Sequence, residues 1–140
     1  MSGSGIMRTP SSENGAIGRN YAYILIGGFF FPLMIAAHII ARKKRVSTDE
    51  IGASHYQLQL RTTSIALIAT VVILFVGVAM ILGIQHASPL QQAEERIYVI
   101  NLINASWLFF LWVAARCIRG LYLAGAAKKI QNPKTFWIWP

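Results

Sequence analysis

The chain has 140 residues, of which 55% are hydrophobic and 13% are charged. Soluble domains carry about 25% charged residues, so this composition argues against a soluble globular domain and indicates that lipid is the solvent. The formal net charge is +8. Because the basic residues flank apolar runs instead of lining one face, we expect them to set membrane topology, and we expect no nucleic-acid partner.

Residues 1–20 are rich in Ser, Gly and Asn and show no apolar periodicity. This composition predicts a mobile N-terminal tail. A three-span membrane domain is expected over residues 21–130. Residues 131–140 are expected to form an interfacial C-terminal tail whose aromatic side chains lie at the membrane surface, namely Phe136, Trp137 and Trp139.

The first apolar run covers residues 21–41 and contains no charged residue. At about 1.5 Å per residue, a helix of this length crosses the hydrocarbon core of a bilayer, which is about 30 Å thick. Pro32 lies near the middle of the run and predicts a kink. Gly27 and Gly28 either let another helix approach closely or mark a flexible point that faces lipid.

Two further uncharged runs, over residues 62–84 and 98–115, predict the second and third spans. The expected fold class is therefore all-α, a three-helix transmembrane protein. Between the first two spans, residues 47–50 have the S-x-x-E form of a capping box, in which Ser47 caps a new helix and Glu50 bonds back to it. This pattern predicts a short interfacial helix that leads into the second span.

A basic cluster, consisting of Arg42, Lys43, Lys44 and Arg45, ends the first run. We expect it to face the cytoplasm and its anionic lipids; a specific site for an acidic lipid or a partner is the alternative. Ten of the 13 Lys and Arg residues fall between the first two spans or after the third. The positive-inside rule therefore predicts an N-terminus outside and a C-terminus in the cytoplasm.

Several short motifs occur around these spans. The segment entering the second span reads Ser54-His55-Tyr56-x-x-Gln59-x-Arg61-Thr62, and weaker motifs are Ala41-Arg42-Lys43, Arg116-Cys117-x-Arg119-Gly120-Leu121 and Asn132-Pro133-Lys134-Thr135. Together they resemble a family of small, uncharacterised bacterial inner-membrane proteins, which is distantly similar to the channel-forming subunit of the chloroplast inner-envelope import machinery. Members of that family typically follow the Arg-Thr pair with two aromatic residues, where this chain has Thr63 and Ser64. The resemblance implies a multi-pass protein of the bacterial inner membrane and no established activity.

The group Ser54, His55, Gln59 and Arg61 is the leading candidate for a functional feature. An arginine at the entrance of a span must be paired, and its candidate partners are Asp49, Glu50, a lipid phosphate or helix-end carbonyls. The group is interpreted either as a structural lock, which bonds this segment to the C-terminal segment, or as a docking patch for a partner protein. Nucleophilic catalysis is not expected, because Ser54 and His55 are adjacent and point to different helix faces. The protein is not expected to be an enzyme.

Two amides, Asn101 and Asn104, lie three residues apart on the third span and therefore share a face. In lipid such side chains commonly join helices, and the alternative is that they line a substrate path. No Asp, Glu, Lys or Arg occurs inside any predicted span, which argues against ion-coupled transport of the usual kind.

The histidines raise a cofactor hypothesis, because haem or chlorophyll ligation needs an imidazole at membrane depth. His38 is the candidate ligand and His55 lies on the same side, whereas His86 is expected on the far side. The alternative is a polar side chain at the level of the lipid headgroups. No motif for a resident metal is visible, and no cofactor is expected.

Because the spans hold few polar groups and no catalytic set, the expected function is non-enzymatic. The leading hypothesis is an accessory or scaffolding subunit of a larger membrane complex, or a homo-oligomer. The alternatives are a small channel or protein-translocation component, and a haem- or pigment-binding subunit of an electron-transfer complex.

Overall fold

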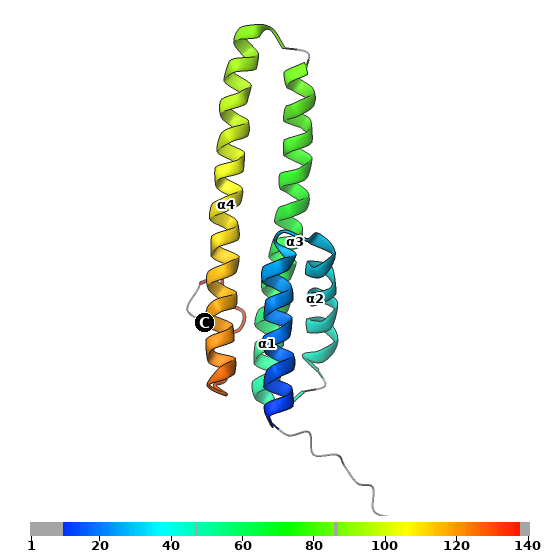
Figure 1. Ribbon diagram of the computed structural model, residues 1–140, viewed down its shortest axis with the longest axis vertical. Coiled ribbons are helices and arrows are strands. Elements are labelled where there is room, and N and C mark those ends of the chain that lie inside the picture. Colours follow the sequence, from blue (N-terminus) through cyan, green and yellow to red (C-terminus); the bar gives the residue numbers. More distant parts are fainter. Residues whose placement is uncertain (1–9, 47, 86, 138–140) are drawn as a thin grey trace, which may run out of the picture.

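A computed structural model describes residues 10–46, 48–85 and 87–137. Within these residues the chain forms four helices and no strand, namely α1 (Pro10–Gly27), α2 (Phe31–Lys44), α3 (Glu50–Gln85) and α4 (Pro89–Gly125). Helices α3 and α4 form a long antiparallel hairpin, and α1 and α2 form a shorter hairpin that packs beside its lower part (Figure 1). We call residues 71–85 and 87–106 the two-helix half, and the other described residues the four-helix half.

Residues 21–41 do not form one helix. The chain leaves α1 after Gly27, reverses direction and re-enters a helix at Phe31. A side chain at Gly27 would come within 2.6 Å of the Met34 backbone nitrogen, so only glycine allows this tight turn. Pro32 lies in the first turn of α2, where a missing N–H group costs nothing, so it starts a helix instead of kinking one. The predicted single span over residues 21–41 is therefore wrong, and a three-span protein is not confirmed.

Helices α3 and α4 are long and apolar enough to cross a membrane, and they contain the predicted runs 62–84 and 98–115. No separate interfacial helix precedes α3, because no proline or other break interrupts the chain between Glu50 and Gln85. The start of α3 is capped by Asp49, whose Oδ1 accepts the Gly52 N–H at 2.8 Å. Ser47, the predicted cap, lies outside the described residues.

The N-terminal prediction also needs correction, because α1 begins at Pro10 and residues 10–20 are helical rather than a tail. Residues 1–9 lie outside the described part of the chain. The helix forms because Ile17, Tyr21 and Ile24, spaced by three and four residues, are all buried against the other helices. Near the end of α4, Gly120 lets Tyr21 approach: a side chain at position 120 would collide with the tyrosine ring.

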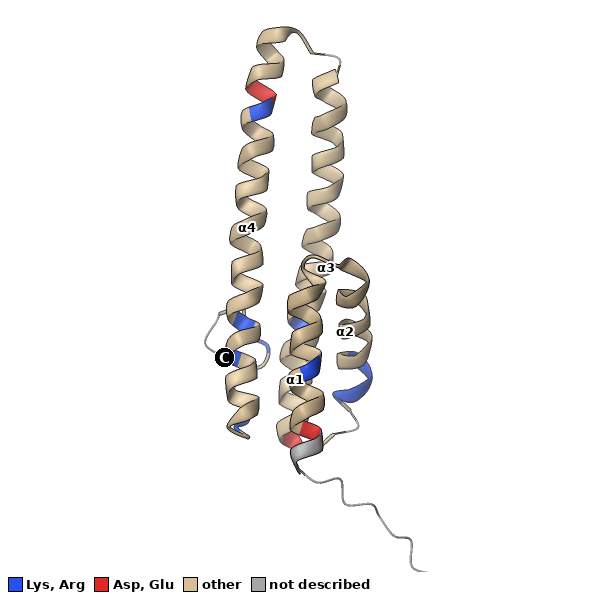
Figure 2. Cartoon of the chain, in the orientation of Figure 1, with Lys and Arg blue, Asp and Glu red and all other residues tan. Residues whose placement is uncertain are grey.

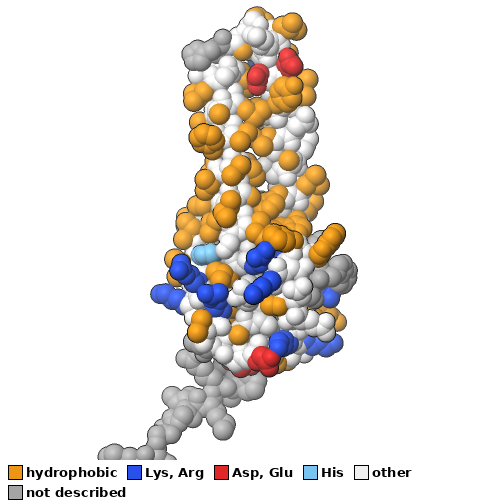
Figure 3. All heavy atoms as spheres, turned by 180° about the vertical axis from the view of Figure 1, so that it is seen from behind, with side chains coloured by type: hydrophobic (Ala, Val, Ile, Leu, Met, Phe, Trp, Pro, Cys, Tyr) orange, Lys and Arg blue, Asp and Glu red, His pale blue; other side chains and the backbone are white. Residues whose placement is uncertain are grey.

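Charge and apolar surface are segregated along the long axis. The lysines and arginines gather on the four-helix half, and a small group of charges lies near the far end of α4 (Figure 2). Between them, apolar side chains are spread over the face of the two-helix half that Figure 3 shows. The start of α1 and the end of α4 lie at the same end of the molecule (Figure 1). The structure thus does not support the predicted topology, in which the two termini lie on opposite sides.

Candidate functional site: a buried polar network

The four-helix half contains a group of polar side chains with almost no exposed surface. Its members come from α1, α3 and α4, and each is at most 2% exposed: Asn20, His55, Gln59, Thr62, Thr63 and Arg116. Burying a polar group without a hydrogen bond is costly. The partners of these side chains therefore show what the network holds together.

Gln59 on α3 and Asn20 on α1 together form hydrogen bonds that connect α1, α2 and α3. Its Oε1 accepts from Asn20 Nδ2 at 2.6 Å, and its Nε2 donates to the Ile17 carbonyl at 3.1 Å. Asn20 Nδ2 also donates to the Ala37 carbonyl on α2, at 3.2 Å. Gln59 was a predicted site residue, whereas Asn20 was missed. The only signal in the sequence was an amide directly before an apolar run.

His55 connects α3 to α1 and to the segment after α4. A carbonyl can only accept, so His55 Nε2 donates to the Lys128 carbonyl at 3.0 Å, and Nδ1 accepts from the Tyr21 hydroxyl at 3.2 Å. His55 precedes the uncharged run that starts at residue 62, and burial lowers its pKa. Its neighbour Ser54 accepts the Ile130 N–H at 3.1 Å. Both residues thus bond to the C-terminal segment.

Arg116 is the largest buried side chain of the network. Its Nε donates to Thr62 Oγ1 at 3.1 Å, and Nη1 donates to the Trp137 carbonyl at 2.6 Å. Its guanidinium lies 4.9 Å from the centre of the Trp112 ring. In the sequence, Arg116 was recognised only as a charge that closes a span and as part of a weak motif. Arg116, on α4, therefore bonds both to α3 and to the C-terminal segment that follows α4.

Arg61 behaves differently from the other three residues of its predicted group. Its guanidinium lies over the Phe136 ring, 4.4 Å from the centroid. It makes no hydrogen bond or ion pair with any described residue, including Asp49 and Glu50. Glu50 instead pairs with Lys129, which is the single ion pair among the described residues. The structure brings Ser54, His55 and Gln59 into the network and leaves Arg61 at its edge.

His38, the candidate cofactor ligand, bonds through Nδ1 to Thr63 Oγ1 at 2.9 Å. His55 faces Tyr21 and Lys128 instead, so the two imidazoles have different partners. In the described part of the chain, no group of three or more His, Cys, Asp or Glu side chains is placed to hold a metal ion. His86 lies outside the described residues.

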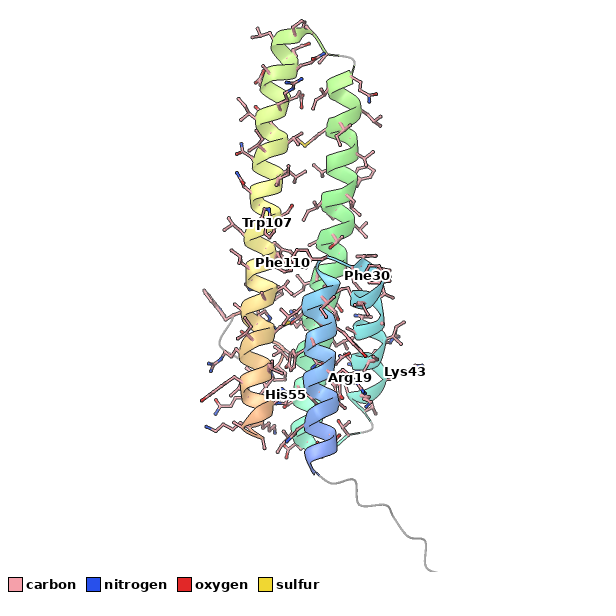
Figure 4. All side chains as sticks on the ribbon, in the orientation of Figure 1. Arg19, Phe30, Lys43, His55, Trp107 and Phe110 are labelled. Atoms are coloured by element: carbon pink, nitrogen blue, oxygen red, sulfur yellow. The ribbon has the colours of Figure 1, made fainter. Side chains whose placement is uncertain are left out.

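The basic cluster lies on the surface of the four-helix half, where Arg42, Lys43 and Arg45 are exposed. Figure 4 shows Lys43 on α2 and Arg19 on the neighbouring α1. The Lys44 Nζ lies 5.9 Å from the centre of the Tyr56 ring.

Asn101 and Asn104 lie on the exposed side of α4 in the two-helix half, and neither bonds to another described residue. The side of α4 that faces α3 carries Leu102, which packs near Gly77. The predicted polar contact between helices is therefore not made within the described part of the chain.

Comparisons with protein-family models, with curated proteins and with solved structures find no match.

Proposed function

We propose that this protein is a non-enzymatic integral membrane protein, an accessory or scaffolding subunit that assembles with a second copy or another membrane protein through the outer face of α4. The observation that carries the proposal is the exposure of two amides, Asn101 and Asn104, within the uncharged run of α4. They lie in a two-helix half that has no buried residue among positions 71–85 and 87–106.

The lengths of the uncharged runs support a membrane position for the two-helix half. Residues 62–85 of α3 and 97–115 of α4 carry no charge, and at about 1.5 Å per residue they extend for roughly 36 and 28 Å. The hydrocarbon core of a bilayer is about 30 Å thick. Arg61 and Arg116 lie at one end of these runs, and Arg96 lies at the other.

The α1–α2 hairpin fits this position as a segment that enters the bilayer and turns back. From Arg19 to Gly27, α1 rises by only about 12 Å, less than half of the hydrocarbon thickness. A turn at that depth must satisfy its own backbone. Three N–H groups of the turn meet this requirement, since Gly28, Phe29 and Phe30 all donate to Leu25 or Ile26 carbonyls, at 2.9–3.3 Å. The exposed Phe29 and Phe30 then meet lipid.

The charge distribution supports one orientation. Among the described Lys and Arg residues, Arg96 alone lies beyond the two apolar runs, and all the others lie on the four-helix half. The positive-inside rule therefore puts the four-helix half, with the start of α1 and the end of α4, on the cytoplasmic side. On the resemblance described above, the proposed location is the bacterial inner membrane.

The assembly step follows from the cost of amides in lipid. An amide without a partner in hydrocarbon is costly, and amides that join transmembrane helices contribute about 0.6–2 kcal/mol each. Asn101 and Asn104 share one face of α4 with Leu108 and Leu111, which are 70% and 58% exposed. This face offers polar and apolar contacts to a second helix.

A cross-linking experiment in intact membranes tests the proposal. The one native cysteine, Cys117, is 1% exposed, so a benzophenone maleimide will selectively label Leu108→Cys, which lies on the face of the two amides and keeps both of them. We expect irradiation to give a covalent dimer of this chain, or a single adduct with another membrane protein, identified by mass. The matched control is Leu102→Cys, which faces α3 and should cross-link only within the chain. Equal adducts at both positions, or none at either, would contradict the proposal.

A small channel is the second candidate, since the same exposed amides would line a polar path between copies. It requires the oligomer and, in addition, ion conductance in planar bilayers. Conductance that is unchanged by Asn101→Leu with Asn104→Leu would reject it.

A further inference from the structure

A groove runs along α3 at the border between the two halves of the molecule. Its volume is about 350 Å³, and its lining residues are Gln57, Leu60, Arg61, Ser64, Ile65 and Ile68. Positions 57, 61, 64 and 68 are spaced by three or four residues and therefore form one stripe on the helix. The stripe is polar towards the four-helix half and apolar towards the two-helix half.

The polar end of the groove presents donors whose partners are missing from the described chain. The Arg61 guanidinium makes no hydrogen bond there, and its Nε atom is buried. Gln57 Oε1 accepts from Arg45 Nη1 at 3.3 Å, which leaves the Gln57 amide N–H groups free to donate. Ser64 donates its hydroxyl proton to the Leu60 carbonyl at 2.8 Å, so it can only accept.

Within the described residues, the Arg61 guanidinium has no ion-pair partner. Arg116, behind it, is close enough for the two like charges to repel. No described carboxylate forms an ion pair with Arg61, since the one ion pair in the described part of the chain joins Glu50 to Lys129. Arginine binds phosphate through two parallel hydrogen bonds. An anion with several acceptor oxygens would therefore satisfy Arg61 and Gln57 together.

We infer that this groove binds an anionic phospholipid, with its phosphate at Arg61 and Gln57 and one acyl chain along Ile65 and Ile68. Arg61 directly precedes the uncharged run. In the membrane position proposed above, Arg61 therefore lies at the depth of the lipid phosphates. Ile68 is 67% exposed and extends the groove towards the hydrocarbon. The inference depends on that membrane position and does not depend on assembly through α4.

Native mass spectrometry of the full chain in mild detergent tests the site. The probes are dioctanoyl phosphatidylglycerol, dioctanoyl phosphatidylcholine and inorganic phosphate. We expect phosphatidylglycerol to bind one per chain in preference to phosphatidylcholine. Arg61→Gln should weaken its binding at least about tenfold, the effect of losing a charged hydrogen bond. The matched control is Arg42→Gln, which removes the same charge from an exposed position outside the groove and should bind as the wild type does.

Four results would overturn the inference. Equal weakening by Arg61→Gln and Arg42→Gln would mean that only the general positive charge of this surface attracts lipid. Phosphate that competes as well as phosphatidylglycerol would mean that the site takes a free anion and no acyl chain. Equal binding of both lipids by the wild type would mean that the groove does not select the net negative charge of phosphatidylglycerol. Ile68→Trp, which fills the apolar end and leaves Arg61 in place, should also weaken phosphatidylglycerol, and unchanged binding would contradict the acyl-chain contact.

Failure of this inference is separable from failure of the proposed function. Carbonate extraction reports membrane insertion, and the cross-link from Leu108→Cys reports assembly. Neither should change in Arg61→Gln.

Discussion

The two halves of this molecule are built from the same two long helices and differ completely in what surrounds them. In the four-helix half, α3 packs on three other helices, and Tyr56 and His55 are 0% exposed. In the two-helix half the same helix has one neighbour, and Phe75 is 76% exposed. The amides differ in the same way, since Gln59 is enclosed and Asn104 has no described partner. One end of a single helix can therefore be buried in a protein core, while the other end exposes apolar side chains that favour an apolar solvent.

The largest effect that tests this comparison is the loss of the enclosed amide. Gln59→Leu removes the two buried hydrogen bonds that Gln59 makes with Asn20 Nδ2 and the Ile17 carbonyl, so we expect it to destabilise the fold by about 2–3 kcal/mol. The measurement is unfolding in mixed micelles with increasing denaturing detergent. Asn104→Leu makes the same chemical change on the exposed face and should alter the stability of the single chain by no more than about 0.5 kcal/mol. Equal losses in the two variants would contradict the contrast between the halves.

Glycine substitutions give the next largest difference. Gly120→Ala places a methyl group against the Tyr21 ring, and overpacking of this kind costs about 1–3 kcal/mol. A side chain at Gly83 meets nothing within 4 Å. Gly83→Ala should therefore stabilise α3 by up to about 1 kcal/mol, the usual gain in a helix. The same unfolding assay measures both, and a destabilising Gly83→Ala would show that this end of α3 is packed.

The smallest expected effect is a pH dependence confined to the four-helix half. Burial lowers the pKa of His55 below its usual value of 6.5, so folding favours the neutral imidazole. The stability from this preference is complete above pH 6.5 and is lost as the pH falls through the lowered pKa of the folded state. The nearby groups are the Tyr21 hydroxyl, the Lys128 carbonyl and the Asp49 carboxylate.

The measurement is the unfolding midpoint between pH 7.5 and 5. The wild type should lose stability over this range, and His55→Gln should lose less, because glutamine does not titrate. Glu50 becomes protonated only below this pH range, since the hydrogen bond with Lys129 holds the pKa of that carboxyl below 4.5. Parallel curves for wild type and His55→Gln would exclude His55 as the titrating group.

Sequence patterns predicted the apolar runs inside α3 and α4 because an uncharged, apolar stretch of about 20 residues matches the thickness of a bilayer. They failed over residues 21–41, since lack of charge indicates the environment of a segment and says nothing about the direction in which it runs. The turn depends on a glycine packed against Met34 and on a proline that suits a helix start as well as a kink.

The polar network was predicted only in part, for a related reason. His55 and Gln59 belong to a recognisable motif, but their partners do not. Asn20 bonds to a residue 39 positions away, and Arg116 bonds to one 54 positions away. Such pairs follow from how the two hairpins pack, which no local spacing encodes.

The turn between α1 and α2, where Gly28, Phe29 and Phe30 donate their N–H groups to the end of α1, bears on how the protein enters its membrane. In the proposed orientation, this hairpin begins and ends on the side where the chain is synthesised, so none of its charged residues has to pass through the bilayer. The segment that must be translocated is the short connection after α3 together with the first turns of α4, whose charges are Glu94, Glu95 and Arg96. Opposite charges there leave a net of one negative charge to be moved across the hydrocarbon. Insertion then requires a single step, in which α3 and α4 enter the bilayer together as a pair.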